Sequence, residues 1–327
     1  MGMSDKDRAL REAQDYYNSM NRCCPNLAQY GRNLNLLATK DNALAPCFSR
    51  EKEIVEIQKI LMRRTKPNVL LTGPAGCGKT AIAEGLAITL MEKYTRYQFD
   101  LIKWERKMYK WLNDHPGVER KDYPVEKPKE PIMSKAIIYD LSMNALLSGS
   151  KYRGEFEEKI QNILNEVKNH PDVILFIDEI HQINAIGNGE GATSMGQILK
   201  PALARADVRV IGATTTEESA MLKTDKALAR RFSEVLVSPL TGDRANETAT
   251  KILDNYSEFH GVEVEGLTAP TILELVQYHV GGVFPNNFID CIDECMSGAR
   301  FDGKSVIGKN EIAETISRLS GHTVIMP

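Results

Sequence analysis

The sequence lacks the features that would place the protein in a membrane or a secretory compartment. No apolar run among its 327 residues approaches the roughly 18 residues that a membrane-spanning helix needs. The opening residues, 1–6, do not form a signal peptide. The six cysteines contain no paired C-x-x-C motif of a zinc site, which favours reduced thiols. We therefore expect a cytoplasmic protein with no membrane partner.

An excess of positive charge is also absent. Lysine and arginine number 41 against 44 aspartate and glutamate residues, which gives a net charge of −3. Because no global basic field is present, we expect no nucleic-acid partner. The chain is 42% hydrophobic, enough for a sizeable core divided over two or three structural units.

A phosphate-binding motif is the most informative feature that is present. Residues 73–80 read G-P-A-G-C-G-K-T and match the pattern G-x-x-x-x-G-K-[ST] between an expected strand at 68–72 and an expected helix at 81–87. The glycines let backbone N–H groups converge on phosphate oxygens, and the helix N-terminus adds positive potential. Lys79 would reach the β- and γ-phosphates, and the Thr80 hydroxyl would bind Mg²⁺. The predicted nucleoside triphosphate site comprises Gly73, Pro74, Ala75, Gly76, Cys77, Gly78, Lys79 and Thr80.

Two adjacent acids supply the second half of a nucleotide-hydrolysing site. The apolar run 173–177 is typical of a strand buried on both faces of a parallel sheet, and Asp178 and Glu179 follow it directly. Ligands bind at the carboxyl edge of such sheets. We expect Asp178 to hold Mg²⁺ and Glu179 to orient and deprotonate the attacking water. The alternative is a solvated acidic pair.

Two further signals are weak when taken singly. The expected strand 208–215 ends in Thr215, whose hydroxyl can position a water or contact the γ-phosphate, although strands often end in threonine. Arg230 and Arg231 stand at an expected helix end. Arginine suits the charge of a phosphoryl-transfer transition state and can act from a neighbouring subunit, but such a pair is usually a solvated surface feature.

Together and in this order, the motifs resemble the Clp-type AAA+ unfoldases of the ClpA, ClpB and ClpC group over roughly residues 28–325. The similarity includes K-Y-R-G-E-F-E-E at 151–158, L-F-I-D-E-I-H at 175–181 and the segment 225–232. It covers the first ATPase module only, since we find no N-terminal substrate domain, coiled-coil insertion or second module, and we expect a single ring. No Ile-Gly-Phe/Leu-type tripeptide for docking on a peptidase is present.

The resemblance implies an α/β fold: an AAA+ P-loop NTPase with a parallel sheet core and a small C-terminal α-helical lid. It implies an ATP hydrolase with Mg²⁺ as cofactor, working as a homohexamer that threads protein substrates through its pore. Thr215 resembles sensor 1, Arg230 and Arg231 the arginine fingers of the next subunit's site, and Tyr152 the aromatic pore-loop residue. An ordinary loop tyrosine is the alternative for Tyr152. The implied division is an N-terminal extension at 1–27, a large α/β subdomain at 28–238 and a lid subdomain at 239–327.

An insertion at 91–133 interrupts the resemblance. Leu101, Trp104, Met108 and Trp111 form an apolar seam on one helix face, and four prolines then favour an extended return. The seam either packs on its own domain or is a docking surface for a partner or adaptor. Two other functions stay open for the whole chain: a regulatory subunit that joins a larger Clp ring, and an AAA+ loader acting on nucleic acid.

Overall fold

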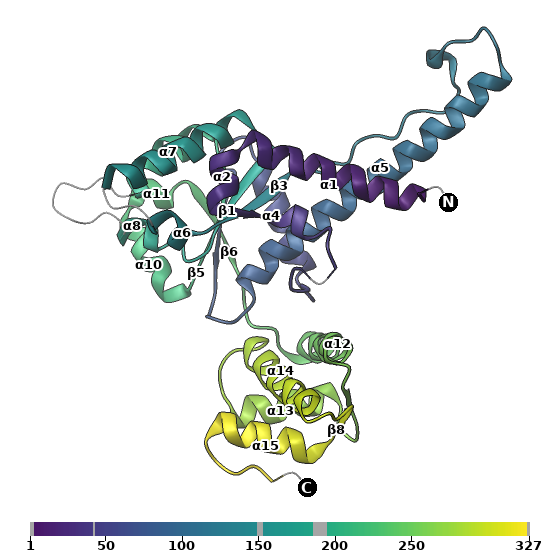
Figure 1. Ribbon diagram of the computed structural model, residues 1–327. Helices are drawn as coiled ribbons and strands as arrows, with labels where there is room; N and C mark the ends of the chain where they lie inside the picture. Colours follow the sequence, from purple (N-terminus) through teal and green to yellow (C-terminus); the bar gives the residue numbers. More distant parts are fainter. Residues whose placement is uncertain (1–2, 42, 149–152, 186–194, 326–327) are drawn as a thin grey trace.

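The computed structural model describes residues 3–41, 43–148, 153–185 and 195–325 (Figure 1). An α/β body is followed by a smaller helical body. The helices of the α/β body are α1 (Asp5–Cys23), α2 (Pro25–Tyr30), α3 (Leu34–Leu37), α4 (Glu51–Leu61), α5 (Lys79–Asp114), the 3-10 helix η1 (Arg120–Asp122), α6 (Met143–Leu147), α7 (Arg153–Asn169), α8 (Gln182–Ala185), α9 (Met195–Arg205), α10 (Thr216–Thr224) and α11 (Lys226–Ala229).

A mixed sheet forms the centre of the α/β body. In spatial order its strands are β1 (Gly31–Asn33), β3 (Ile137–Leu141), β4 (Val173–Ile177), β5 (Arg209–Thr214), β2 (Asn68–Thr72) and β6 (Phe232–Leu236). Strand β1 pairs antiparallel with β3, and the other neighbours pair parallel. The parallel strands therefore deliver their carboxyl ends to one edge, where open α/β sheets bind ligands.

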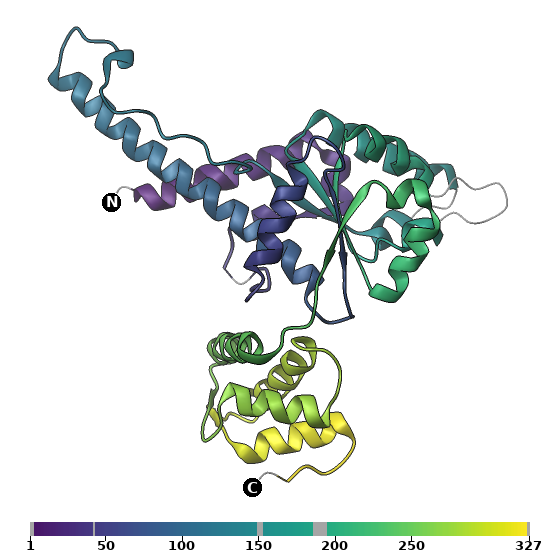
Figure 2. The ribbon, with the colours of Figure 1, turned by 180° about the vertical axis from the view of Figure 1, so that it is seen from behind.

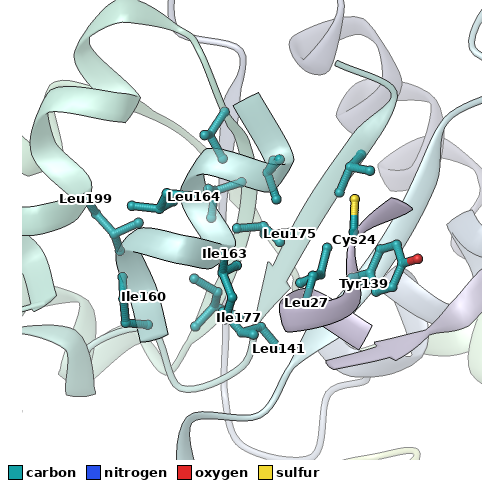
Figure 3. Packing of buried hydrophobic residues seen from close by; sticks show 14 of the residues in the cluster. Cys24, Leu27, Tyr139, Leu141, Ile160, Ile163, Leu164, Leu175, Ile177 and Leu199 are labelled. Atoms are coloured by element: carbon teal, nitrogen blue, oxygen red, sulfur yellow. The ribbon is translucent and has the colours of Figure 1, made fainter. Parts of the chain in front are cut away.

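Helices bury both faces of this sheet, which explains why its central strands are apolar throughout. Along β4, Leu175 and Ile177 face a core built with α1, α2, α7 and α9 (Figure 3). The intervening Ile174 and Phe176 face a second core formed with α4 and the first half of α5. Since side chains alternate along a strand, each strand ties the two cores together.

Helix α5 continues beyond the body as an arm (Figures 1 and 2). Its 36 residues run without a break from the phosphate loop into the insertion, so the two helices expected from the sequence are one. The chain returns along the helix, and the Trp104 indole donates to the Val125 carbonyl at 2.9 Å. Tyr123 packs on both Trp104 and Trp111, and Met108 is fully buried. The apolar seam thus packs largely within the insertion itself.

The helical body is joined to the sheet by the segment after β6 (Figure 2). A separate apolar core, which includes Ile252, Ile272, Phe288 and Ile316, holds it together. Its elements are α12 (Gly242–His260), β7 (Glu263–Val264), α13 (Ala269–His279), α14 (Asn286–Phe301), β8 (Val306–Ile307) and α15 (Lys309–Ser320).

The predicted fold class is confirmed, with differences in detail. The expected strands at 68–72, 173–177 and 208–215 are present, displaced by no more than a residue at their ends. The antiparallel edge strand β1 was not predicted, because three residues carry too little periodicity to be recognised. In the described ranges, no helix has both the length and the hydropathy to cross a membrane.

Candidate nucleotide-binding site

The phosphate loop joins β2 to α5 at the carboxyl edge of the sheet. Strand β2 is buried along its whole length between β5 and β6, which gives the loop a rigid base. Gly78 has φ +96° and caps α5 from the left-handed region, where residues with a Cβ are strained. Gly73 is required for another reason, since a Cβ there would lie 2.3 Å from the Val237 carbonyl oxygen. The loop therefore passes directly under the segment that leads to the lid.

Lys79 lies at the first position of α5, within the curve of the loop. Its ammonium group donates to the carbonyl oxygens of Gly73 and Pro74, each at 2.9 Å. These bonds hold the charge where the loop's N–H groups converge. Phosphate oxygens brought to this point would meet both the ammonium group and the helix N-terminus.

Thr80 and Asp178 meet across the sheet edge, although 98 residues separate them in the sequence. The Thr80 hydroxyl donates to Asp178 Oδ2 at 2.7 Å, and Asp178 Oδ1 accepts from the backbone N–H of Glu179 at 2.9 Å. A hydroxyl and a carboxylate on rigid elements are hard oxygen donors of the kind that Mg²⁺ prefers. This donor set fits the predicted magnesium site.

Glu179 is exposed to the same cleft, with φ +49°, an uncommon conformation for a residue other than glycine. Gln182, one turn along the chain, donates its side-chain amide to Glu179 Oε2. The carboxylate is thereby held in the cleft beside Asp178, where a general base would act.

Thr215 lies at the same edge, but its hydroxyl is engaged as the N-cap of α10. It donates to Glu218 Oε2 at 2.8 Å and accepts from the Glu218 N–H at 3.2 Å. The neighbouring Thr214 hydroxyl lies 3.0 Å from His181 Nδ1, and His181 lies 3.3 Å from Glu218 Oε2. Hydrogen bonding by Thr215 holds the pKa of Glu218 below its usual value. Any contact of Thr215 with a γ-phosphate would compete with the cap.

The remaining predicted residues lie apart from this cleft or outside the described ranges. Arg230 and Arg231 follow α11, Arg230 exposed and Arg231 half-buried, and neither lines the cleft of its own chain within the described residues. Such placement is compatible with action on a neighbouring subunit. Tyr152 belongs to residues 149–152, which the structure does not describe.

Two adjoining cavities surround the start of α5, each lined by residues of both bodies. The polar one, of 860 Å³, is lined by Lys79, Thr80, Asp178, Glu179 and Asn286. The other, of 650 Å³, is lined by mostly apolar side chains: Leu44, Phe48, Ala81, Ile252, Tyr256 and Ile289. Their chemistries suit a triphosphate and a planar base respectively.

Several residues of these cavities were not predicted from the sequence. Arg32 and Asp140 form an ion pair of 2.6 Å in the lining of the polar cavity, and Asn286 of the helical body also lines it. Asp140 could have been found, since it follows an apolar run as Asp178 does. Arg32 and Asn286 could not, because only the folded chain brings them near the phosphate loop. Cys77 lines the apolar cavity, and burial raises the pKa of its thiol, which disfavours the thiolate.

Comparison with known proteins connects this geometry to a family. Residues 69–240 match the ATPase family associated with various cellular activities (AAA). Among curated relatives, the chaperone protein ClpB of Aquifex aeolicus is 36% identical over 294 residues, which cover 89% of this chain and 25% of the relative. The ATP-binding subunit ClpC of the Clp protease of Staphylococcus saprophyticus is 35% identical over 278 residues, covering 84% and 30% respectively.

Solved structures show the same relationship. Hsp104 of S. cerevisiae in complex with ADP has a TM-score of 0.70 and 29% identity, over 91% of this chain and 46% of that one. Hsp104 in complex with casein has a TM-score of 0.68 and 27% identity, over 90% and 45%. The chain thus spans between a quarter and a half of the proteins that it matches.

Proposed function

The chain belongs to the AAA family of ATPases, and we propose that it is a Clp-type remodelling ATPase that threads polypeptide through a ring. The observation that carries the ATPase part is the meeting of Thr80 with Asp178 beside the exposed Glu179. These side chains combine a cation site with a carboxylate placed to accept a proton from water. Lys79, whose ammonium group donates to the loop, lines the same cavity.

The site would bind ATP between the α/β body and the lid. The base would enter the apolar cavity and the triphosphate the polar one. Mg²⁺, held by Thr80 and Asp178, would neutralise phosphate charge when bound. Glu179 would orient the attacking water and take its proton.

Action on protein substrates is supported by similarity. The matched Hsp104 structure contains casein, and the relatives include a chaperone. We propose that Tyr152 grips the substrate in the pore of a homohexamer. The division into an extension at 1–27, a large subdomain at 28–238 and a lid at 239–327 is part of this proposal, as is a partner or adaptor at the insertion.

The ring arrangement is tested by complementation between two inactive variants. Glu179→Gln removes the base of a subunit's own site, whereas Arg231→Ala, made together with Arg230→Ala, removes the groups offered to a neighbour. An equal mixture would place intact bases beside intact arginines at about a quarter of random interfaces, and hydrolysis should return towards that fraction of the wild-type rate. A mixture as inactive as its parts would contradict action between subunits.

A further inference from the structure

Arg50 connects the phosphate loop to the segment that leads into the lid. Its side chain lies almost wholly inside the protein, with the residue 3% exposed. One arm of the guanidinium donates to the Cys77 carbonyl of the phosphate loop at 2.7 Å, and the other donates to the Ser238 carbonyl at 2.9 Å. The second arm also pairs with Glu53 Oε1 at 2.9 Å. A buried guanidinium requires such partners, so these contacts fix its position.

The first helix of the lid, α12, approaches the same place from the other side. Arg244 donates to the Ser49 carbonyl, and the Thr248 hydroxyl donates to the Ser49 hydroxyl at 2.8 Å. Ser49 has φ +56°, a strained conformation for serine that the lid contacts help to hold. Ser49 directly precedes Arg50 in the chain. The contacts that α12 makes with Ser49 therefore also constrain Arg50, which donates to the phosphate loop.

The Glu53 carboxylate lies between Arg50 and Arg244, and one of its oxygens accepts no hydrogen bond among the described residues. Its Oε1 pairs with Arg50, while its Oε2 is buried and has no hydrogen-bond partner in the described part of the chain. Arg244 Nη2 lies 3.9 Å from that oxygen. A charge-assisted hydrogen bond is about 2.8 Å long, so an approach of about 1 Å would complete the pairing. An orphaned buried carboxylate oxygen facing a cation is costly, and the cost falls as the lid approaches.

We propose that Arg50, Glu53 and Arg244 form a relay that couples lid position to the phosphate loop. The inference rests on the proposed nucleotide site, because a ligand in the two cavities touches both bodies and draws α12 inward. Arg244 then reaches Glu53, and Glu53 holds Arg50 against the Cys77 carbonyl. The three residues act as positioning residues: they set how tightly the loop is held for phosphate, and none supplies a reacting group.

The relay is tested by ADP affinity, measured with a fluorescent ADP on the full chain. Glu53→Gln, Arg244→Gln and the double variant should each weaken ADP binding about 10-fold, with no further loss in the double variant because one relay is broken. In steady-state hydrolysis KM for ATP should rise while kcat changes less than about twofold. Arg244→Lys should restore part of the affinity, since one ammonium group cannot serve both Ser49 and Glu53.

A matched control and a stability measurement separate the possible outcomes. Arg318→Gln breaks an ion pair with Glu294 inside the lid and should leave affinity unchanged. Urea midpoints of the ligand-free proteins should agree closely. Variants that bind ADP as wild type does, additive losses, or affinity loss that follows a lowered urea midpoint would each overturn the relay. If wild type itself failed to bind ADP, the proposed function would fall instead.

Discussion

Glu179 and Lys79 both line the polar cavity, and their substitution should separate hydrolysis from binding. Glu179→Gln keeps the size of the side chain and its contact with Gln182 but removes the base. We expect hydrolysis to fall about 100-fold or more while ATP affinity stays near that of wild type. Single-turnover hydrolysis and equilibrium binding of a fluorescent nucleotide measure the two quantities. Equal losses in both would mean that Glu179 acts in binding.

Lys79→Ala should give the opposite pattern. Loss of charge-assisted bonds to phosphate is worth about 2 kcal/mol, so affinity for ATP should fall about 30-fold. Lys93→Ala, on the same helix but bonded to Gln58, serves as the control and should bind normally. If Lys79→Ala bound ATP with unchanged affinity in a nucleotide titration, Lys79 would not contact the bound phosphates.

The position of a single residue could be predicted where the residue directly follows a buried strand. It could not be predicted where contacts between distant parts of the chain determine its partners. Asp178 and Glu179 could be placed because a buried strand must end at the sheet edge. For Thr215 the sequence placed the residue at the edge, and its T-x-x-E pattern with Glu218 is a capping-box signature that our sequence analysis did not use, although the two side chains cap α10 in this way. Arg50 belongs to a segment whose role depends on a helix nearly 200 positions away.

At the scale of single elements, α15 offers a test of the lid's stability. In its first turn, Glu311 accepts from the Gly308 N–H at 3.0 Å and pairs with Lys304, and the pKa of Glu311 is lowered to about 2, chiefly by the Gly308 bond. Because folding lowers the pKa of Glu311, its carboxylate stabilises the folded state at pH values above the pKa of the unfolded chain. That stabilisation is lost as the pH falls towards 2. Glu311→Ala should therefore cost about 1 kcal/mol at pH 7 and much less near pH 2.5.

Urea unfolding of wild type and Glu311→Ala at both pH values measures this difference. Glu314→Ala, an exposed change in the same helix, is the control and should have little effect at either pH. A cost for Glu311→Ala that stayed constant with pH would show that the charge of the carboxylate is not involved.

The arm of α5 is the element to remove. Lys79 lies 15 residues before Tyr94, about 23 Å along the helix. Replacing residues 95–130 by a short Gly/Ser linker should therefore leave nucleotide binding and basal hydrolysis intact, while response to protein substrate or adaptor falls. Basal and substrate-stimulated ATPase rates measure both. Unchanged substrate handling would exclude a docking role for the arm.

Helices and strands with strong periodicity were predicted from the sequence. That the phosphate-loop helix and the insertion helix form one continuous helix was not predicted. The seam of Leu101, Trp104, Met108 and Trp111 indicated a helix, and in the structure it belongs to α5, which packs against α1. The ring of Tyr16 in α1 packs at a tilt against that of Tyr94 in α5, with ring centroids 5.0 Å apart. Local sequence carries no record of such a contact.

In the whole molecule, the cavities that would bind nucleotide lie between two bodies, and we propose that hydrolysis there drives work on polypeptide. The order of motifs predicted the AAA fold, because the phosphate loop, the Asp178–Glu179 pair and Thr215 each follow a strand that ends at one sheet edge. The geometry between the bodies was beyond prediction, since it depends on contacts such as Arg244 with Ser49 that have no pattern in the sequence.

In steady-state ATPase measurements made on the protein alone, with unfolded casein and with single-stranded DNA, we expect basal hydrolysis that rises with casein and not with DNA, and Tyr152→Ala should keep the basal rate but lose the rise. Stimulation by DNA alone would contradict a polypeptide-threading ATPase and favour a loader acting on nucleic acid. Absence of hydrolysis in the assembled protein would instead favour a regulatory subunit of a larger ring.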